Sequence, residues 1–542
     1  MAGTEVTSEK RLLRFLHYGS VTATYTPGSR SHTISQQNEN IDALHKVLSE
    51  VDEKAFDIIK TVYKANTSPH PELIPFALAE CTRVEGLKTK AIRTAEILCD
   101  DTKLFFLFFK FGMERDPKLG SSPTCRKLIS SYYLKKDIMK LVSEVAMYPS
   151  YRGWRHGDLL CLSHIKAKEG DTAREAIFRY ITRGAKQMKE DFQDKPEAKE
   201  VVEYLTKVHE FRKETDPSKV AQTIEIYSLS FEHVNFTHLK SKVVWSALLR
   251  QISLRTLLDH FSLIARNKLF RNGRAWDEAF ITSVSDVLQN NQAIKKSKIH
   301  PSRVYLENLS YQLEARFKLD TGVKKHTHAS QKYPAVSIDI VTRLSQLTTA
   351  TMKLLEPTKL RYLISVDPFD LNVRKCGYVP YLTPSHAAAI IVQCYLKVEP
   401  NVTVVGPTFA GNISPIELAK DEKTTNIETT LSDLRNPNKS TAPGQKLPKR
   451  DFTQSMLGVF EWASSAKKKF DVIILIATSI NSTNYVAKFN QYQRTMKVPR
   501  SKLVLISLCN AKATVDTKEI FIVSGFDDKV CSLVNSFVTE VF

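Results

Sequence analysis

The hydrophobic pattern of the sequence changes near residue 357, and this change limits the architectures that the chain can form. From about residue 40 to residue 355, apolar side chains recur at the spacing of amphipathic helices, with no strand-like run between them. After the change, helical stretches separate five short apolar runs rich in β-branched residues: LRYLISVD, NVTVVG, FDVIILIA, SKLVLISL and EIFIVSG. Such runs are typical of strands buried on both faces, and their alternation with helices predicts a doubly wound α/β domain with a mainly parallel sheet. We therefore predict a helical module over residues 1–356 and an α/β domain over residues 357–542.

The helical module is expected to be an α-solenoid. In GDTAREAIFRYITRG, Thr172 and Glu175 have the spacing of a capping box, and Gly184 is suited to a left-handed helix stop. Pro301 marks the start of a later helix. Many paired amphipathic helices with short connections predict a solenoid of HEAT type, although the sequence has no clean fixed-period repeat.

The charge of the chain favours a polyanionic partner. There are 78 Lys and Arg against 58 Asp and Glu, which gives a formal net charge of +20. Residues 351–542 hold 24 of the basic and 17 of the acidic residues, an excess of +7, so residues 1–350 hold the other +13. An excess spread through folded regions fits nucleic acid first and an acidic membrane second. Charge alone is also compatible with a soluble basic protein that has no such partner.

The spacing of the cysteines and the absence of enzyme motifs narrow the expected cellular location and function of the protein. Eight cysteines lie far apart without CxxC or Cys–His zinc spacing, which is typical of a reduced, intracellular protein. The start, MAGTEVTSEKR, has no apolar signal core, and no apolar run approaches the length of a membrane span. We expect a cytoplasmic protein, also present in the nucleus, without a membrane partner. The patterns GxxxxGK(S/T), HExxH and GxSxG are absent, so we expect no enzyme.

Five stretches of the helical module carry a resemblance to a known family: RLLRFLHYGS (11–20), PFALAECT (75–82), RGWRHGDLLCLSHIK (152–166), FEHVNFTHLKSKVVWSALL (231–249) and KIHPSRV (298–304). In order and approximate spacing they resemble segments of the Ro autoantigen family, and the C-terminal runs resemble its von Willebrand factor A-type domain. The resemblance implies a TROVE module, in which HEAT-like repeats form a ring that the A-type domain closes. It also implies that small structured Y RNAs bind the basic outer surface, and that single-stranded ends of misfolded RNAs enter the central hole.

The resemblance implies RNA-binding residues around position 164. In the family, a histidine at the position of His164 belongs to the Y RNA surface. The further candidates beside it are Arg152, Arg155, His156 and Lys166. Arginine makes bidentate contacts with phosphate, and histidine rings stack on unpaired bases. The alternative is that Trp154 and the leucines of this stretch form the core face of a helix, which His164 merely caps or fills.

A second candidate group is His238, Lys240 and Lys242 in THLKSK, which resembles the family segment near the hole of the ring. Backbone N–H groups at a helix start, together with two lysines, would suit a phosphate. A solvated lysine face explains the same residues equally well. The basic runs at 266–274 and 295–303 are expected to extend the surface or to be exposed helix ends.

The metal site of the A-type domain is expected to be degenerate. Such domains bind Mg²⁺ through D-x-S-x-S after the first strand, a threonine in a middle loop, and often an aspartate after the fourth strand. Asp367 keeps the first position, but Phe369 and Leu371 replace the serines. Arg450 stands at or near the threonine position, and Thr478 replaces the aspartate. One carboxylate binds Mg²⁺ weakly, and Asp370 is a poor substitute, so we predict no cofactor.

These observations predict a monomeric, non-catalytic RNA-binding protein of a small cytoplasmic ribonucleoprotein. It would stabilise or survey Y RNA-like and misfolded small noncoding RNAs, with other RNA-processing proteins as further partners. Met147 and Tyr151 stand where the family has basic residues, so the RNA footprint is expected to differ or to bind less tightly. The alternative is a HEAT-type scaffold for proteins whose basic charge is incidental.

Overall fold

The computed structural model describes residues 6–28, 38–320, 336–368, 371, 375–377, 379, 381–408, 411–434, 452–512 and 515–542. Cα packing divides the chain into two compact units. The helical unit comprises Ser8–Val21 and Arg30–Ile252, and the mixed unit comprises Met1–Thr7, Thr22–Ser29 and Ser253–Phe542. The predicted domain boundary near residue 357 lies within the mixed unit and stays a prediction.

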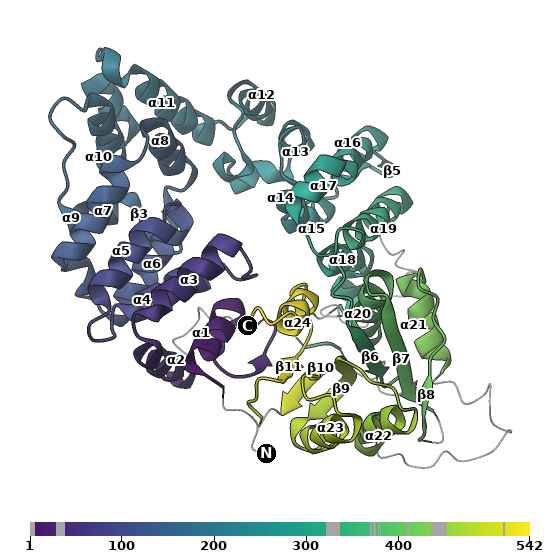
Figure 1. The fold of residues 1–542 in the computed structure, drawn as a ribbon. Coiled ribbons are helices and arrows are strands. Elements are labelled where there is room, and N and C mark those ends of the chain that lie inside the picture. The colour runs from purple at the N-terminus through teal and green to yellow at the C-terminus, as the bar shows by residue number, and fades with distance from the viewer. Residues whose placement is uncertain are drawn as a thin grey trace. The chain divides into compact units, whose positions relative to one another are not determined.

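The helical unit is a succession of helices joined by short connections (Figure 1). They are α1 (Ser8–Tyr18), α2 (Asn38–Val51), α3 (Lys54–Ala65), α4 (Leu73–Cys81), α5 (Lys88–Leu98), α6 (Thr102–Arg115), α7 (Pro123–Lys135), α8 (Ile138–Met147), α9 (His156–Ser163), α10 (Thr172–Phe192), α11 (Lys199–Lys213), α12 (Pro217–Tyr227) and α13 (Lys242–Leu249). Helices α4 and α6, α10 and α11, and α12 and α13 pack as neighbouring pairs. Phe105, Phe106, Phe108 and Phe109 of α6 are all buried, so this helix lies at the centre of an aromatic core.

The start of α10 corrects one sequence prediction. Asp171, rather than Thr172, is the N-cap, because its side chain accepts a hydrogen bond from the backbone N–H of Arg174. Gly184 adopts φ 83° and ψ 176°, which interrupts the helix as predicted, but the chain resumes helical geometry and continues to Phe192. Glycine tolerates this positive φ because it lacks a Cβ.

The mixed unit begins with further helices: α14 (Leu254–Asp259), α15 (Phe261–Arg266), α16 (Glu278–Gln289), α17 (Asn291–Ser297), α18 (Pro301–Asp320) and α19 (Ile338–Met352). Pro301 opens α18, as predicted. Two hydrogen bonds connect α18 to the α/β domain. The Tyr305 hydroxyl donates to Glu428 Oε1 at 2.7 Å, and Ser302 Oγ donates to the carbonyl of Asp528 at 2.9 Å.

A seven-stranded sheet forms the centre of the α/β domain. Its strands are β1 (Thr24–Tyr25), β6 (Arg361–Val366), β7 (Asn401–Pro407), β8 (Ile413–Pro415), β9 (Val472–Asn481), β10 (Lys502–Lys512) and β11 (Ile520–Ser524). Their spatial order is β1-β11-β10-β9-β6-β7-β8, and only the β7–β8 pair is antiparallel. The chain passes from β6 to β7 on one side and later to β9 on the other. The carboxyl end of β6 is therefore the switch point of the sheet.

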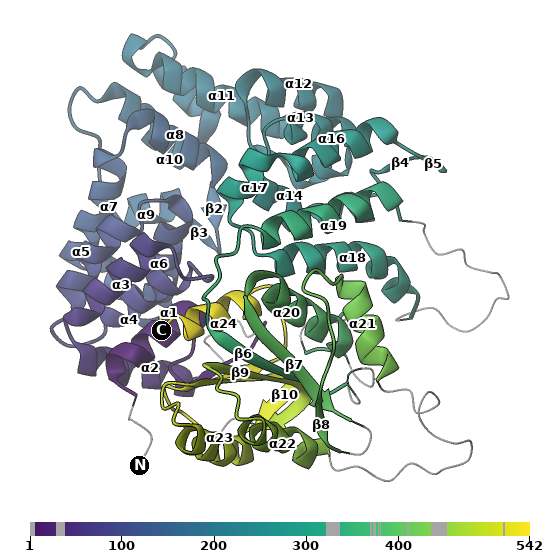
Figure 2. The ribbon, with the colours of Figure 1, turned by 45° about the vertical axis from the view of Figure 1, so that its right-hand side comes forward.

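Helices cover both faces of this sheet (Figure 2). On one face, α22 (Phe452–Ser465) and α23 (Ser482–Met496) bury Phe460, Phe489 and Tyr492 against strand residues such as Leu363 and Leu505. On the other face lie α20 (Pro384–Val398), which packs on β7, β9 and β10, and α24 (Val530–Val538), which packs on β11. Helix α21 (Thr424–Asp433) packs against α20.

Strand β1 comes from the other end of the sequence. Thr24 and Tyr25 pair in parallel with Ile522 and Val523 of β11, and the Tyr25 hydroxyl donates to Asp527 Oδ2 at 2.6 Å. A strand of two residues has no periodicity of its own, so the sequence pattern did not predict it.

The predicted fold class is confirmed: a long series of helices is followed in the same chain by a doubly wound α/β domain. Each of the five predicted apolar runs forms a parallel strand. The HEAT assignment and closure into a ring stay predictions. The loop expected at 433–450 starts at the end of α21 and lies almost entirely outside the described residues. None of the helices in the described segments combines the length and the apolar character needed to span a bilayer.

Candidate functional site

The stretch around residue 152 forms a small β-hairpin. Its strands are β2 (Ser150–Tyr151) and β3 (Trp154–Arg155). Arg152 and Gly153 form a two-residue turn with φ values of 52° and 91°, as a type I′ turn requires. Arg152 therefore lies at the exposed tip, with its guanidinium 5.9 Å from the ring centroid of Tyr151. The Trp154 ring, 6.1 Å from that of Phe109, anchors the hairpin to the core of the helical unit.

Helix α9 continues directly from this hairpin and carries exposed basic side chains at both ends. At its start, the Arg155 N–H donates to Asp158 Oδ2 at 2.9 Å, and the Arg155 side chain is exposed. At its end, the exposed His164 adopts a left-handed conformation, with φ 52° and ψ 30°, and Lys166 is exposed just beyond it. Eight helical residues rise by about 12 Å at 1.5 Å per residue. The structure thus brings Arg152, Arg155, His164 and Lys166 to one hairpin and helix.

His156 lies in the core, which corrects the prediction that it belongs to the exposed group. Its side chain is 2% exposed, and its ring lies 4.8 Å from that of Phe106. Its Nδ1 shares a hydrogen bond of 2.7 Å with the Tyr133 hydroxyl. Burial lowers the pKa of His156 to about 3, with Lys136 contributing in the same direction, so the ring is neutral near pH 7. The alternative for this stretch, a core face of Trp154 and leucines capped by His164, describes the buried Leu159 and Leu160 and the position of His164 at the end of α9. His156 joins the same core.

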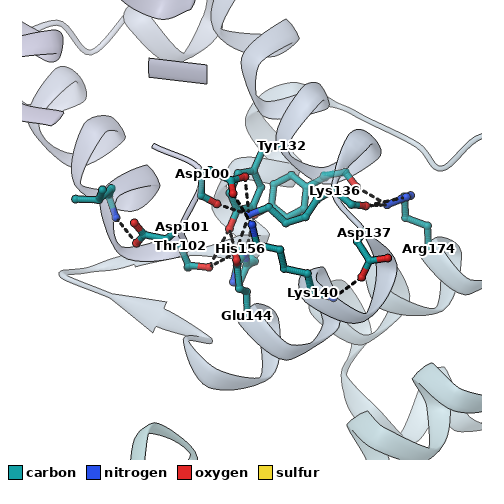
Figure 3. A network of polar contacts seen from close by, with 12 residues as sticks. Asp100, Asp101, Thr102, Tyr132, Lys136, Asp137, Lys140, Glu144, His156 and Arg174 are labelled. Carbon is teal, nitrogen blue, oxygen red and sulfur yellow. Dashed lines mark hydrogen bonds and ion pairs between the residues drawn. The ribbon is translucent and has the colours of Figure 1, made fainter. Parts of the chain in front are cut away.

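A buried ion pair holds the helices beneath the hairpin together (Figure 3). Lys136 Nζ, at the end of α7, lies 2.8 Å from Glu144 Oε2 on α8, and their side chains are 3% and 12% exposed. The same oxygen accepts hydrogen bonds from the Tyr132 hydroxyl at 2.6 Å and from Thr102 Oγ1 at 3.0 Å. Lys136 Nζ also lies 3.7 Å from the Tyr132 ring centroid and donates to the carbonyl of Asp100. Both charges are therefore hydrogen-bonded, as buried charges require.

Arg174 extends this network to α10. Its guanidinium donates to the carbonyl of Tyr133 at 2.9 Å and to the carbonyl of Lys136 at 3.2 Å. It also forms an ion pair of 2.8 Å with Asp171, the N-cap of the same helix. Because these acceptors are the last carbonyls of α7, Arg174 satisfies backbone groups that would otherwise lack partners. The network fixes α6, α7, α8 and α10 as one support for the hairpin.

The second candidate group is only partly exposed. His238 lies in a short 3₁₀ turn (Phe236–Lys240) and is buried, with Nε2 2.9 Å from the carbonyl oxygen of Glu214. This position corrects its predicted role as a surface contact. Lys240 is exposed, whereas Lys242, the first residue of α13, is half-buried. Of the three residues of this group only Lys240 is exposed, so the group does not form an exposed basic cluster like the one around Arg152 and His164.

The carboxyl end of β6 carries little of the donor set that Mg²⁺ needs. Asp367 is 3% exposed, Leu371 is fully buried, and Thr478 is 2% exposed within β9. Strands β9 and β10 continue past this point, because their pairing resumes after a register shift and runs to Asn481 and Lys512. The other positions assessed for metal binding, Phe369, Asp370 and Arg450, lie outside the described residues. Within the described part of the chain, no three histidine, cysteine, aspartate or glutamate side chains gather where they could hold an ion.

Known proteins share the sequence features and the fold of this chain. The model of the Ro60 vWA domain matches residues 361–538. The chain is 22% identical to the RNA-binding protein RO60 of Caenorhabditis elegans, over 98% of this chain and 88% of that one. The crystal structure of the Ro (RSR) protein of Deinococcus radiodurans has the same fold, with a TM-score of 0.78 at 18% identity, over 99% of this chain and 100% of that one. Residues 361–538 thus match the vWA domain of Ro60, and the chain as a whole is similar to Ro proteins in sequence and in fold.

We expect Glu144→Ala to lower the free energy of unfolding by about 3–5 kcal/mol. The reason is that the change removes the buried counter-charge of the Lys136 ammonium and leaves it only the more distant, half-exposed Asp100 carboxylate, 3.5 Å away. Urea denaturation followed by circular dichroism measures the loss. The matched control is Glu96→Ala, which removes the partner of the exposed Lys135 and should cost about 1 kcal/mol or less. Equal losses for the two variants would contradict the structural role of the buried pair.

The buried histidines predict a loss of stability in mild acid. The folded-state pKa values of His156 and His233 are lowered to about 3 and about 4, so below about pH 6.5 the unfolded chain binds protons that the folded chain does not. Their stabilising effect is complete above that pH. It falls by about 1.4 kcal/mol per histidine for each pH unit below it.

Urea denaturation between pH 7.5 and pH 5 tests this dependence, with His156→Asn expected to flatten the curve by about one proton. His164→Asn, at an exposed position, is the control and should leave the curve unchanged. A His156→Asn curve parallel to that of the native protein would show that His156 is not a source of the pH dependence.

Proposed function

We propose that this chain is an RNA-binding protein of the Ro family. The observation that carries the proposal is the arginine-tipped hairpin that leads directly into α9. Arg152 and Arg155 are exposed on this hairpin, and His164 and Lys166 are exposed at the other end of the helix. The relationship to a worm protein named for RNA binding supports the same conclusion. The net charge of +20 supplies the attraction that steers a polyanion to such a surface.

The chemistry of the four side chains fits a structured RNA. Arginine forks bind phosphate oxygens in a bidentate manner, and a lysine contributes a point charge. The exposed His164 offers a flat ring at a helix end, where an unpaired base can stack. The buried network beneath the hairpin keeps these groups in place, so little conformational entropy is lost when RNA binds.

In more detail, we propose that the RNAs are small noncoding RNAs of Y RNA type and misfolded small RNAs, which the protein stabilises or surveys without catalysing a reaction. It would act as a monomer in a cytoplasmic ribonucleoprotein, also in the nucleus, with other RNA-processing proteins as partners. Residues 147–155 hold two basic residues, Arg152 and Arg155, since Met147 and Tyr151 carry no charge. We therefore expect the affinity to depend strongly on Arg152 and Arg155.

Replacing Arg152 and Arg155 by Gln should weaken RNA binding and make it less sensitive to salt. Each phosphate contact contributes close to one unit to the slope of log affinity against log salt concentration, so the double variant should lose about two units. Filter binding of a small hairpin RNA at several salt concentrations measures this slope.

The matched control is Lys195→Gln with Lys199→Gln, which removes two exposed charges elsewhere in the helical unit and should leave affinity nearly unchanged. If the native protein binds no RNA and purifies without it, the scaffold alternative is favoured. If it binds but the hairpin variant binds as tightly, the RNA surface lies elsewhere on the chain.

We also propose that the sheet of this protein functions without Mg²⁺ at the end of β6. The support is chemical: Asp367 is a single buried carboxylate, Leu371 offers only hydrocarbon and Thr478 only a hydroxyl, whereas Mg²⁺ prefers several oxygen ligands in octahedral geometry.

Thermal unfolding with millimolar MgCl₂ and with EDTA should therefore give the same midpoint. A site filled at 100 times its Kd would instead add about 2.7 kcal/mol to the free energy of unfolding. Asp367→Asn is the matched variant, and its response to Mg²⁺ should equal that of the native protein. Stabilisation by Mg²⁺ that disappears in Asp367→Asn would refute the proposal, whatever the variant's own stability.

A further inference from the structure

The connection between α15 and α16 in the mixed unit is strongly basic. Residues 266–276, RNKLFRNGRAW, contain four basic and no acidic residues. The sequence predicted that the run at 266–274 either extends the basic surface or is an exposed helix end. In the structure α15 ends at Arg266, and the rest of the run forms a second β-hairpin. Its strands are β4 (Arg271–Asn272) and β5 (Ala275–Trp276), joined by a turn of Gly273 and Arg274.

This hairpin has a rigid base. The Asp277 N–H donates to the carbonyl of Phe270 at 3.0 Å, which continues the ladder below the Arg271–Trp276 pair. Phe270 is 2% exposed, and its ring lies 5.6 Å from that of Phe261 and 5.7 Å from that of Tyr311. The base of the hairpin is therefore part of the aromatic core of these helices, so the basic tip projects from a fixed support.

The basic side chains of this hairpin are exposed or held in place. The Arg271 guanidinium lies 4.2 Å from the ring centroid of Trp276, within the range of a cation–π contact. Such stacking orients the planar guanidinium and lowers the entropy lost when it binds a phosphate. Arg274 is exposed in the turn, and Lys268 is exposed in a left-handed conformation with φ 56°.

The two hairpins of the chain share one plan. Each has a two-residue turn made of one glycine and one arginine, and each has a tryptophan on its returning strand. In each, an arginine lies near the face of an aromatic ring of the same hairpin, Tyr151 in the first and Trp276 in the second. The second hairpin thus presents the same chemistry as the first, from a different unit of the chain.

We propose that the β4–β5 hairpin is a second RNA-binding element, which contacts the phosphodiester backbone of a structured RNA through Arg271 and Arg274. This inference rests on the proposed function. RNA is favoured over an acidic protein because Leu269 and Phe270, the large aliphatic and phenyl side chains of the segment, are both buried. Trp276 is half-buried and lies against the Arg271 guanidinium, so the fully exposed part of the hairpin is polar and basic and has no large apolar anchor of the kind that dominates the binding energy of protein interfaces.

The test uses a double variant of the full chain that carries both Arg271→Gln and Arg274→Gln. Filter binding of a small hairpin RNA compares this variant with the native protein. We expect weaker binding and a salt slope lower by about two units, because two phosphate contacts are lost. The matched control, Lys420→Gln with Lys423→Gln, removes two exposed charges from the same unit and should leave the slope unchanged. Arg274→Gln alone, at the exposed turn, keeps the test valid if the double variant folds poorly, with an expected change of about one unit.

The outcomes separate this inference from the proposed function. If the native protein binds no RNA, both fail together. Suppose that the native protein binds RNA and that the Arg152 and Arg155 variant binds it more weakly. If the Arg271 and Arg274 variant then shows native affinity and a native salt slope, only the second element is overturned. A loss of slope shared equally by the lysine control would also overturn it, since the effect would then reflect net charge rather than this hairpin.

Discussion

The buried ion pair between Lys136 and Glu144 is the interaction on which the candidate surface depends. An ammonium and a carboxylate removed from water are tolerated only where both are fully hydrogen-bonded, and here a tyrosine, a threonine and a backbone carbonyl complete the set. Because these partners come from α6, α7 and α8, a movement of any one of these helices breaks either the ion pair or a hydrogen bond to the buried carboxylate. The hairpin and α9 are attached to this support, with Trp154 and His156 packed on phenylalanines of α6.

Basic residues at helix ends are a recurrent feature of the chain. Among the described residues, eleven non-glycine residues have a positive φ, and seven of these are Lys, Arg or His. Several of them follow a helix directly, such as His164 after α9 and Lys298 after α17. A left-handed conformation costs a non-glycine residue about 1–2 kcal/mol. A positive charge near the negative end of a helix dipole offsets part of this cost, and these positions also present the charge to solvent.

Much of the fold could be predicted from the sequence, and the physical reason differs by region. The five parallel strands were predictable because strands buried on both faces leave a continuous apolar run. Glu144 was missed, although it lies on the same face of α8 as Leu141 and Val145, a position where an acidic residue signals a buried partner. His156 and His238 were misassigned because motif resemblance locates a residue in the chain but does not say which way its side chain points. The two arginine hairpins were likewise invisible to pattern analysis, since two-residue strands have no period.

The pairing of β1 with β11 has a consequence for how the protein is made. An edge strand of the C-terminal sheet is supplied by residues 24 and 25, while its neighbour spans residues 520–524. Translation proceeds from the N-terminus, so this short segment is synthesised almost 500 residues before the strand that receives it. The sheet can reach its full width only after residue 524 has left the ribosome. Completion of the sheet therefore requires that residues 24 and 25 stay available for pairing until residues 520–524 have been synthesised.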